Sequence, residues 1–240
     1  MTTLLSVEGV SKNYGALTVT DNITFTVPQG ATLGILGPNG AGKTTLFNLI
    51  AGDVRQDKGR IVFGASDVSA MAPHKRCRQG IGRSYQIPQP YNAMTVLENC
   101  LVAASFGGGL TEQDAGARSV DVLARTGLLK KANQLAGGLA LLDRKRLELA
   151  RALSTGPRLL LLDEIAGGLT EYEAKSLVEQ IMVIKEQGVT MVWIEHVVHA
   201  LLAVADTLMV LNFGAKLAEG EPAAVMNDPQ VQRVYMGMQT

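Results

Sequence analysis

Cysteine is scarce in this sequence of 240 residues, in which only Cys77 and Cys100 occur. Two thiols are too few for a disulfide framework, and no metal-ligand spacing surrounds them, so we expect free cysteines in a reducing compartment. The first residues also lack the basic stretch and apolar run of a secretory leader. The apolar stretches at residues 159–162 and 208–211 are too short to span a bilayer. We therefore expect a cytoplasmic protein that relies on another chain for any membrane-spanning part.

The chain has no excess of charge of either sign. Lys and Arg together number 22, Asp and Glu together number 22, and the formal net charge is zero. This balance gives no electrostatic basis for nucleic acid binding, so we expect no nucleic acid partner. The apolar fraction of 47% and the length suit one large domain, or a domain with a sizeable insertion, that buries a real core.

Strand and helix patterns alternate at both ends of the chain and enclose a helical middle. Short apolar runs bounded by turn residues predict strands at 7–10, 23–27, 31–36, 59–63, 159–162 and 190–194. Helices are expected at 42–51, 172–187 and 200–205. From about Val96 to Ser154 apolar residues recur at helical spacing, and three glycines at 107–109 break the run. The pattern predicts an α/β core with a helical insertion.

A glycine-rich segment follows the expected strand at 31–36 and fits the phosphate-loop pattern G-x-x-x-x-G-K-[ST]. Its glycines let the backbone wrap closely around phosphate, and the helix that starts there adds the positive end of its dipole. Lys43 is expected to reach the β- and γ-phosphates, and the Thr44 hydroxyl to bind magnesium. A chance turn is the alternative, but the strand before it and the helix after it favour a nucleotide site. The predicted nucleotide contacts are Gly37, Pro38, Asn39, Gly40, Ala41, Gly42, Lys43, Thr44 and Thr45.

Two carboxylates end the apolar strand at 159–162. At the carboxyl end of a core strand, Asp163 and Glu164 should lie beside the phosphate loop. Asp163 suits magnesium, and Glu164 suits the base that orients or deprotonates the attacking water. An ordinary strand end is the alternative, but the phosphate loop upstream favours a catalytic role.

In this order the motifs resemble those of the ABC-type ATPases. Tyr14 resembles the aromatic residue of that family that stacks on adenine. Gln86, after Ser84 and Tyr85, resembles the glutamine that contacts magnesium and senses the membrane partner. His196 resembles the histidine that holds the γ-phosphate. Each alone could be an ordinary surface or strand-end residue, but together they favour the functional interpretation.

The resemblance covers essentially the whole chain and is closest to the ATPases of branched-chain amino acid importers, whose relatives carry urea and short amides. Supporting stretches are Leu97 to Asn99, Arg146 to Leu153, and the tail from Asn227 to Gly237. The resemblance implies ATP hydrolysis with ATP and Mg²⁺ as cofactors. It also implies transmembrane permease subunits as partners, a solute-binding receptor as an indirect one, and a peripheral position on the inner face of the cell membrane.

The same resemblance implies the fold and its division. We expect a P-loop NTPase core with a mixed sheet, an N-terminal antiparallel β subdomain and an inserted α-helical subdomain. The whole of 1–240 would be a single ABC ATPase domain. Residues 1–88 and 157–240 would form the nucleotide-binding core with its β subdomain, and 89–156 the helical subdomain.

A docking surface for the membrane subunit is expected beside Gln86, from Ile87 to Val96. Its loop is stiff and partly apolar, which suits a socket for a helix. The loop residues are Pro88, Gln89, Pro90 and Tyr91. An exposed connector is the alternative.

One family motif is damaged. The L-S-G-G-Q signature at the start of a helix corresponds to residues 139–143, which read Leu-Ala-Leu-Leu-Asp. The stretch at 135–139 looks more like the signature but lies four residues early, more than one helical turn, and is treated as a decoy. Ala140 cannot make the serine's bond to the γ-phosphate, and Asp143 adds a negative charge near it.

The basic residues after the damaged signature allow two interpretations. Arg144, Lys145 and Arg146 could offset Asp143, but a solvated basic helix face is the favoured interpretation. Two smaller departures follow Glu164: Ile165 replaces the usual proline, and Thr170 replaces the residue that often links the two sites of a dimer.

In the family, two cassettes meet head to tail, so that the signature of one completes the ATP site of the other. This chain has complete motifs for its own site and a poor signature for its neighbour's site. We therefore expect a heterodimer with a second ATPase subunit that carries an intact signature. The alternatives are a soluble ABC-type ATPase outside transport, and a regulatory subunit that binds ATP with little hydrolysis.

Overall fold

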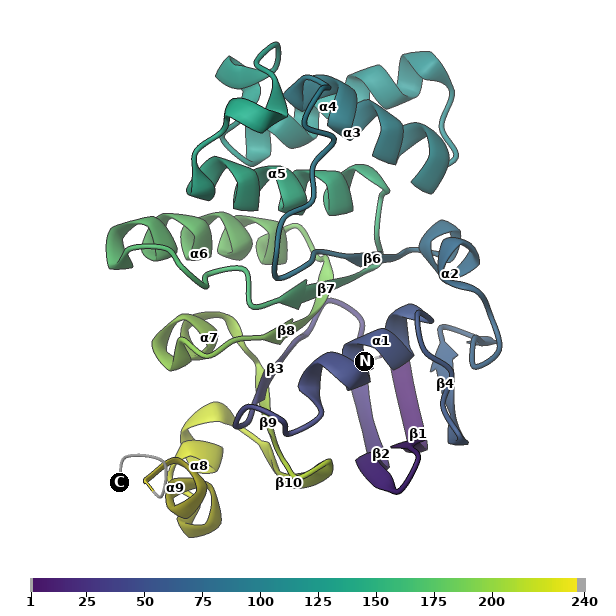
Figure 1. Cartoon of the computed structure of the whole chain (residues 1–240), viewed down its shortest axis with the longest axis vertical. Helices are drawn as coiled ribbons and strands as arrows, with labels where there is room; N and C mark the ends of the chain where they lie inside the picture. Colours follow the sequence, from purple (N-terminus) through teal and green to yellow (C-terminus); the bar gives the residue numbers. More distant parts are fainter. Residues whose placement is uncertain (1, 237–240) are drawn as a thin grey trace.

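Two β-sheets and a cluster of helices form residues 2–236, the part of the chain that the computed structural model describes (Figure 1). The strands are β1 (Thr3–Tyr14), β2 (Leu17–Pro28), β3 (Thr32–Leu36), β4 (Lys58–Phe63), β5 (Ser66–Asp67), β6 (Ile81–Arg83), β7 (Leu159–Asp163), β8 (Thr190–Ile194), β9 (Thr207–Asn212) and β10 (Ala215–Gly220). The α-helices are α1 (Lys43–Ala51), α2 (Pro73–Gln79), α3 (Val96–Val102), α4 (Glu112–Arg125), α5 (Leu141–Ser154), α6 (Glu171–Glu186), α7 (Val198–Val204), α8 (Pro222–Met226) and α9 (Pro229–Met236). Shorter helical turns cover Ala103–Gly107, Leu129–Lys131 and Ala136–Gly138.

The larger sheet has the strand order β10-β9-β3-β8-β7-β6. Strands β9, β3, β8, β7 and β6 run parallel, and β10 pairs antiparallel with β9. Parallel strands end at the same edge of a sheet, and ligands bind at that edge in open α/β folds. The segments that follow β3, β6, β7 and β8 therefore meet at one edge, which we call the carboxyl edge.

Strand β7 illustrates why the central strands are apolar throughout. Leu159 and Leu161 lie in a core that includes α1, whereas Leu160 and Leu162 lie in the core that includes α5, α6 and α7. Side chains of a strand alternate between the two faces of its sheet, and both faces of this sheet are covered. The four consecutive leucines therefore contribute alternately to the two hydrophobic cores on opposite faces of the sheet.

The second sheet is antiparallel and has the order β2-β1-β4-β5. Figure 1 shows β1, β2 and β4 beside α1, and apolar residues of both sheets share one core with that helix. Helices α3, α4 and α5 gather at the opposite end of the molecule (Figure 1). Thr95 begins α3 with a reciprocal cap, in which its hydroxyl accepts from the Glu98 amide and the Glu98 carboxylate accepts from the Thr95 amide.

The expected fold class, an α/β core with an antiparallel β subdomain and inserted helices, is confirmed. The division at 88/89 and 156/157 stays a prediction. The helical middle is less continuous than predicted, because the segment between α4 and α5 contains only short turns at Leu129–Lys131 and Ala136–Gly138. Gly237, the end of the tail stretch, lies outside the described residues. Within residues 2–236, no helix has the length and apolar character needed to cross a bilayer.

Candidate nucleotide site

The phosphate loop joins β3 to α1 at the carboxyl edge. Gly42 caps the start of α1 with a φ of 93°, a left-handed conformation that favours glycine. A β-carbon at this position would stand 2.3 Å from the Val19 carbonyl oxygen, so only glycine fits. The loop opens on a cavity of ≈ 180 Å³ that is lined by Val19, residues 39–45 and Glu164.

Lys43 lies at the inner side of this loop and is only 5% exposed. Its Nζ donates to the carbonyl oxygens of Gly37, at 2.7 Å, and Pro38, at 3.0 Å. Burial lowers the pKa of Lys43, while the nearby charges of Glu164 and Asp163 act to raise it. The predicted phosphate-binding cation therefore stands within the field of both predicted carboxylates.

Asp163 ends β7 and is 3% exposed. Its Oδ2 accepts from Arg83 Nη2 at 3.1 Å, whereas its Oδ1 is buried and has no hydrogen-bond partner among the described residues. A buried carboxylate oxygen without a partner is costly unless a cation uses it. Thr44 is exposed in the first turn of α1 and offers a hydroxyl oxygen. The oxygens at this site fit magnesium, a hard cation.

Arg83 is a member of the site that the sequence analysis missed. It is the last residue of β6, and its guanidinium also donates to Asn48 Oδ1 at 2.7 Å and to Asp53 at 2.8 Å. Three partners from different elements fix the guanidinium, which in turn fixes one oxygen of Asp163. Its position immediately before Ser84 gave no signal, because its contacts come from distant parts of the chain.

Glu164 lies between two other predicted site residues. His196 Nε2 is 2.6 Å from its Oε1, and Gln86 Nε2 donates to its Oε2. The backbone of Glu164 has a φ of 45°, which non-glycine residues adopt mainly at constrained positions. The structure thus brings together Gln86, Glu164 and His196 from the ends of β6, β7 and β8.

Glu195 binds the main chain next to Glu164 and at His196, and the sequence analysis did not identify it. It is 1% exposed, and its carboxylate accepts from the backbone amides of Ala166, at 2.7 Å, and His196, at 3.1 Å. Burial raises the pKa of Glu195, and these amide bonds oppose that shift. A charged residue directly after the apolar strand at 190–194 was the available signal.

Tyr14 is the last residue of β1 and pairs with Leu17 at the end of the β1–β2 hairpin. Its side chain is half exposed, and Lys12 Nζ lies 5.5 Å from the centre of its ring. Val19 of the same hairpin lines the nucleotide cavity, but Tyr14 does not. The adenine contact of Tyr14 stays a prediction.

The damaged signature lies at the start of α5, as the resemblance implied. Ala140 occupies the N-cap position, and no side chain caps the helix there. The decoy stretch includes the short turn Ala136–Gly138. The first turn of α5 therefore presents backbone amides without the usual serine hydroxyl.

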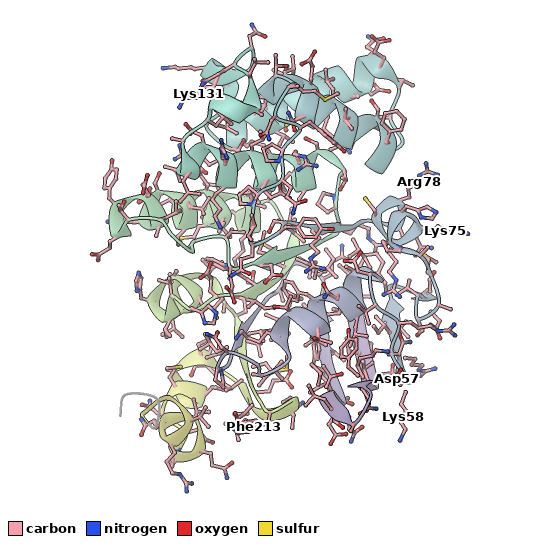
Figure 2. All side chains as sticks on the ribbon, in the orientation of Figure 1. Asp57, Lys58, Lys75, Arg78, Lys131 and Phe213 are labelled. Carbon is pink, nitrogen blue, oxygen red and sulfur yellow. The ribbon has the colours of Figure 1, made fainter. Side chains whose placement is uncertain are left out.

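The interpretation of residues 144–146 as a solvated basic face is wrong. Lys145 is only 4% exposed, and its Nζ donates to the Gln86 carbonyl oxygen. Asp143 pairs with Lys131, labelled among the helices in Figure 2, and Arg146 Nη1 lies 3.6 Å from the same carboxylate. Asp143 is thus neutralised within the chain, partly by a lysine that the sequence analysis did not name.

Two segments of the chain match models of known protein families. Residues 20–167 match the family described as ABC transporter. Residues 215–237 match the family described as branched-chain amino acid ATP-binding cassette transporter.

Individual relatives agree over nearly the whole chain. The high-affinity branched-chain amino acid transport ATP-binding protein LivG of Escherichia coli (strain K12) is 35% identical, with 98% of each chain covered. The lipopolysaccharide export system ATP-binding protein LptB of Haemophilus influenzae is 33% identical, also with 98% of each covered. A solved ATP-binding cassette of an ABC transporter in its ADP conformation superposes with a TM-score of 0.89 at 30% identity, covering 99% of this chain and 100% of the other.

Proposed function

Since the chain belongs to the ABC transporter family and is an ATP-hydrolysing subunit of that family, we propose that it powers the import of branched-chain amino acids or related small solutes. One observation carries the catalytic part: Lys43 and Glu164 line one cavity at the carboxyl edge, and the charge of Asp163 also acts on Lys43. The solute class rests on the match at residues 215–237 and on the similarity to LivG. LptB is about as similar, so a lipopolysaccharide exporter is the second candidate.

The geometry suggests a role for each residue in hydrolysis. The loop amides and Lys43 bind the β- and γ-phosphates of ATP, and His196 holds the γ-phosphate. Glu164 orients water for attack on the γ-phosphorus and accepts its proton, while the bond to the ADP oxygen breaks. Magnesium, which Thr44, Gln86 and Asp163 Oδ1 would hold, neutralises phosphate charge when it is bound.

The partner that we infer is a permease, bound through the loop after Gln86. Large apolar side chains are exposed there: Ile87 is 72%, Tyr91 48% and Met94 37% exposed. Arg151 stacks 5.1 Å from the centre of the Tyr91 ring and donates to the Gln89 carbonyl oxygen, which stiffens the loop. Val96, the last residue of the predicted surface, is fully buried and does not belong to it.

A groove of ≈ 270 Å³ continues this surface between α2, β6 and the helices. Its lining includes the polar side chains of His74, Tyr85, Glu148 and Arg151. An exposed apolar loop beside a groove that carries a few polar side chains suits a short helix of a membrane subunit. Exposed apolar side chains that lie together mark interaction surfaces, which supports a protein partner at this loop.

Expression of the tagged chain with its genomic neighbours, followed by purification from detergent-solubilised membranes, tests the proposal. We expect permease subunits to co-purify, and uptake of labelled leucine, isoleucine or valine to depend on Glu164. Ile87→Asp and Met94→Asp should remove the permease and uptake together, whereas Tyr172→Asp, at an 84% exposed site on α6, should not. Assembly and uptake that survive both changes would reject the docking surface, and an assembled complex without uptake of these solutes would reject the solute class.

A further inference from the structure

A buried lysine connects the start of α5 to the catalytic edge of the sheet. Lys145 lies in the first two turns of α5 and is 4% exposed. Its Nζ donates to the Gln86 carbonyl oxygen at 2.6 Å and lies 3.4 Å from the Glu164 carbonyl oxygen. Among the described residues, no carboxylate forms an ion pair with it. Its direct partners are thus two backbone carbonyls, each from a segment that carries a proposed site residue.

The surroundings explain why an ammonium group stays at this position. Burial of a cation is costly unless negative charge lies nearby. Burial lowers the pKa of Lys145, and the charges of Glu195, Glu164, Glu148 and Asp163 oppose that shift. Glu148 and Glu195 are 4% and 1% exposed. The ammonium group is buried near several carboxylates, but its hydrogen bonds go to the main chain. This arrangement fits a role in holding the segments of Gln86 and Glu164 in place.

The backbone of Glu164 needs such support. Its φ of 45° is a left-handed conformation that a non-glycine residue keeps only when its surroundings enforce it. On one side, the Glu164 amide donates to the Ile194 carbonyl oxygen, and on the other the Gly167 amide donates to the Glu164 carbonyl oxygen. Lys145 adds a contact to that same carbonyl from the helical part of the molecule.

Other cations of α5 do not make this connection. Arg151 reaches the Gln89 carbonyl oxygen, farther along the loop, and Arg144 reaches carbonyl oxygens of Gly137 and Leu139 before its own helix. Lys145 alone among these three contacts both the Gln86 segment and the Glu164 segment. A shift of α5 relative to the sheet would therefore displace the main chain of both residues.

We propose that Lys145 is a positioning residue for hydrolysis, which fastens α5 to the main chain of Gln86 and Glu164 and so sets the place of the Glu164 carboxylate. The inference rests on the proposed role of Glu164 as the base. Because Lys145 contacts neither the phosphate loop nor Tyr14, its loss should affect the rate of hydrolysis and leave the affinity for ATP almost unchanged.

The test compares four variants of the full chain: Lys145→Met, Lys145→Arg, Lys175→Met and Glu164→Gln. Lys175 is exposed on α6, so Lys175→Met is the matched control. Single-turnover hydrolysis of MgATP with the chain in excess gives the chemical rate, and equilibrium dialysis gives Kd. For Lys145→Met we expect a rate at least about tenfold lower, with a Kd within about twofold of the parent chain. Lys145→Arg should recover most of the rate, because a guanidinium can donate to both carbonyls.

Three outcomes would overturn the proposal. One is a Lys145→Met rate within twofold of the parent, and a second is an equal loss of rate and affinity that Lys145→Arg does not repair. If Lys145→Met fails to fold, Lys145→Gln replaces it, because its shorter amide can donate to one of the two carbonyls but not to both. A parental rate of hydrolysis for Lys145→Gln is the third outcome. Normal turnover by Glu164→Gln would instead reject the role of Glu164 as the base. That result would remove the premise of the inference, whereas the contacts of Lys145 would stand.

Discussion

His196 Nε2 lies 2.6 Å from Glu164 Oε1 at the carboxyl edge of the larger sheet. The other carboxylate oxygen accepts from Gln86, so side chains from the ends of two strands hold the proposed base from both sides. A carboxylate that is fixed in this way has little freedom to turn away from the water that it must orient. The first prediction follows from this contact.

His196→Ala should slow hydrolysis at least about tenfold, because Glu164 loses its close contact with the imidazole and the γ-phosphate loses a donor. The Kd for ATP should change less than about threefold, since the phosphate loop remains intact. Rate and Kd measured on the same preparation check this. His199→Ala, at an exposed position of α7, is the control and should match the parent chain. A parental rate for His196→Ala would contradict the account of the site.

Lys43→Ala should weaken ATP binding at least about tenfold, because a charge-assisted phosphate contact is lost. Isothermal titration with MgATP measures this directly. Lys58→Ala is the control: Lys58 is exposed on β4, and Figure 2 shows it at the edge of the molecule. If the two variants bound ATP equally well, Lys43 would have no role in phosphate binding.

Tyr14→Ala should raise the Kd for ATP roughly threefold to tenfold, because a stacked aromatic ring contributes about 0.5–1.5 kcal/mol beyond its area. The single-turnover rate at saturating ATP should stay near the parental value. Tyr14→Phe should bind like the parent, which separates stacking from the hydroxyl. Unchanged affinity in Tyr14→Ala would mean that the half-exposed ring only packs against the β1–β2 hairpin.

Much of the fold could be predicted from local patterns. The continuous apolar run that became β7, and the strand at 190–194 that became β8, are recognisable because both of their faces are buried. Strands β5, β6, β9 and β10 were not predicted, although the run at 208–211 within β9 is apolar and buried like that of β7. β6 has only three residues, and β10 has no buried residue that would produce an alternating pattern.

The residues of the site likewise fall into those that the sequence predicts and those that it does not. Glycine spacing and strand ends locate the phosphate loop, Asp163 and Glu164, because those motifs are local in sequence. Arg83 and Lys145, two further cations with little exposed side chain, could not be found in this way. Their partners lie far along the chain: Arg83 and Asp163 are 80 residues apart, and Lys145 and Gln86 are 59 apart. A basic residue has no local signal that separates such a position from a solvated one.

The degenerate signature leads to a prediction of asymmetry in the assembled transporter. Ala140 lacks the hydroxyl that a partner's γ-phosphate would use, and Asp143, which is paired with Lys131 and Arg146, offers no donor to replace it. In a heterodimer with an intact partner, most hydrolysis should occur at this chain's own site. Glu164→Gln here should therefore remove most ATPase activity of the complex, and the equivalent change in the partner clearly less. Equal losses, or rapid cooperative hydrolysis by this chain alone, would contradict the asymmetry.

The most direct test of the central claim, that this chain hydrolyses ATP with Glu164 as the base, is single-turnover hydrolysis by Glu164→Gln in the full chain. The amide keeps the shape of the side chain but is a poor base. We predict a Kd for MgATP within about twofold of the parent chain and a rate of phosphate release lowered at least about a hundredfold. Release of phosphate at the parental rate would contradict the assignment of the base, and with it the mechanism that the geometry of the site supports.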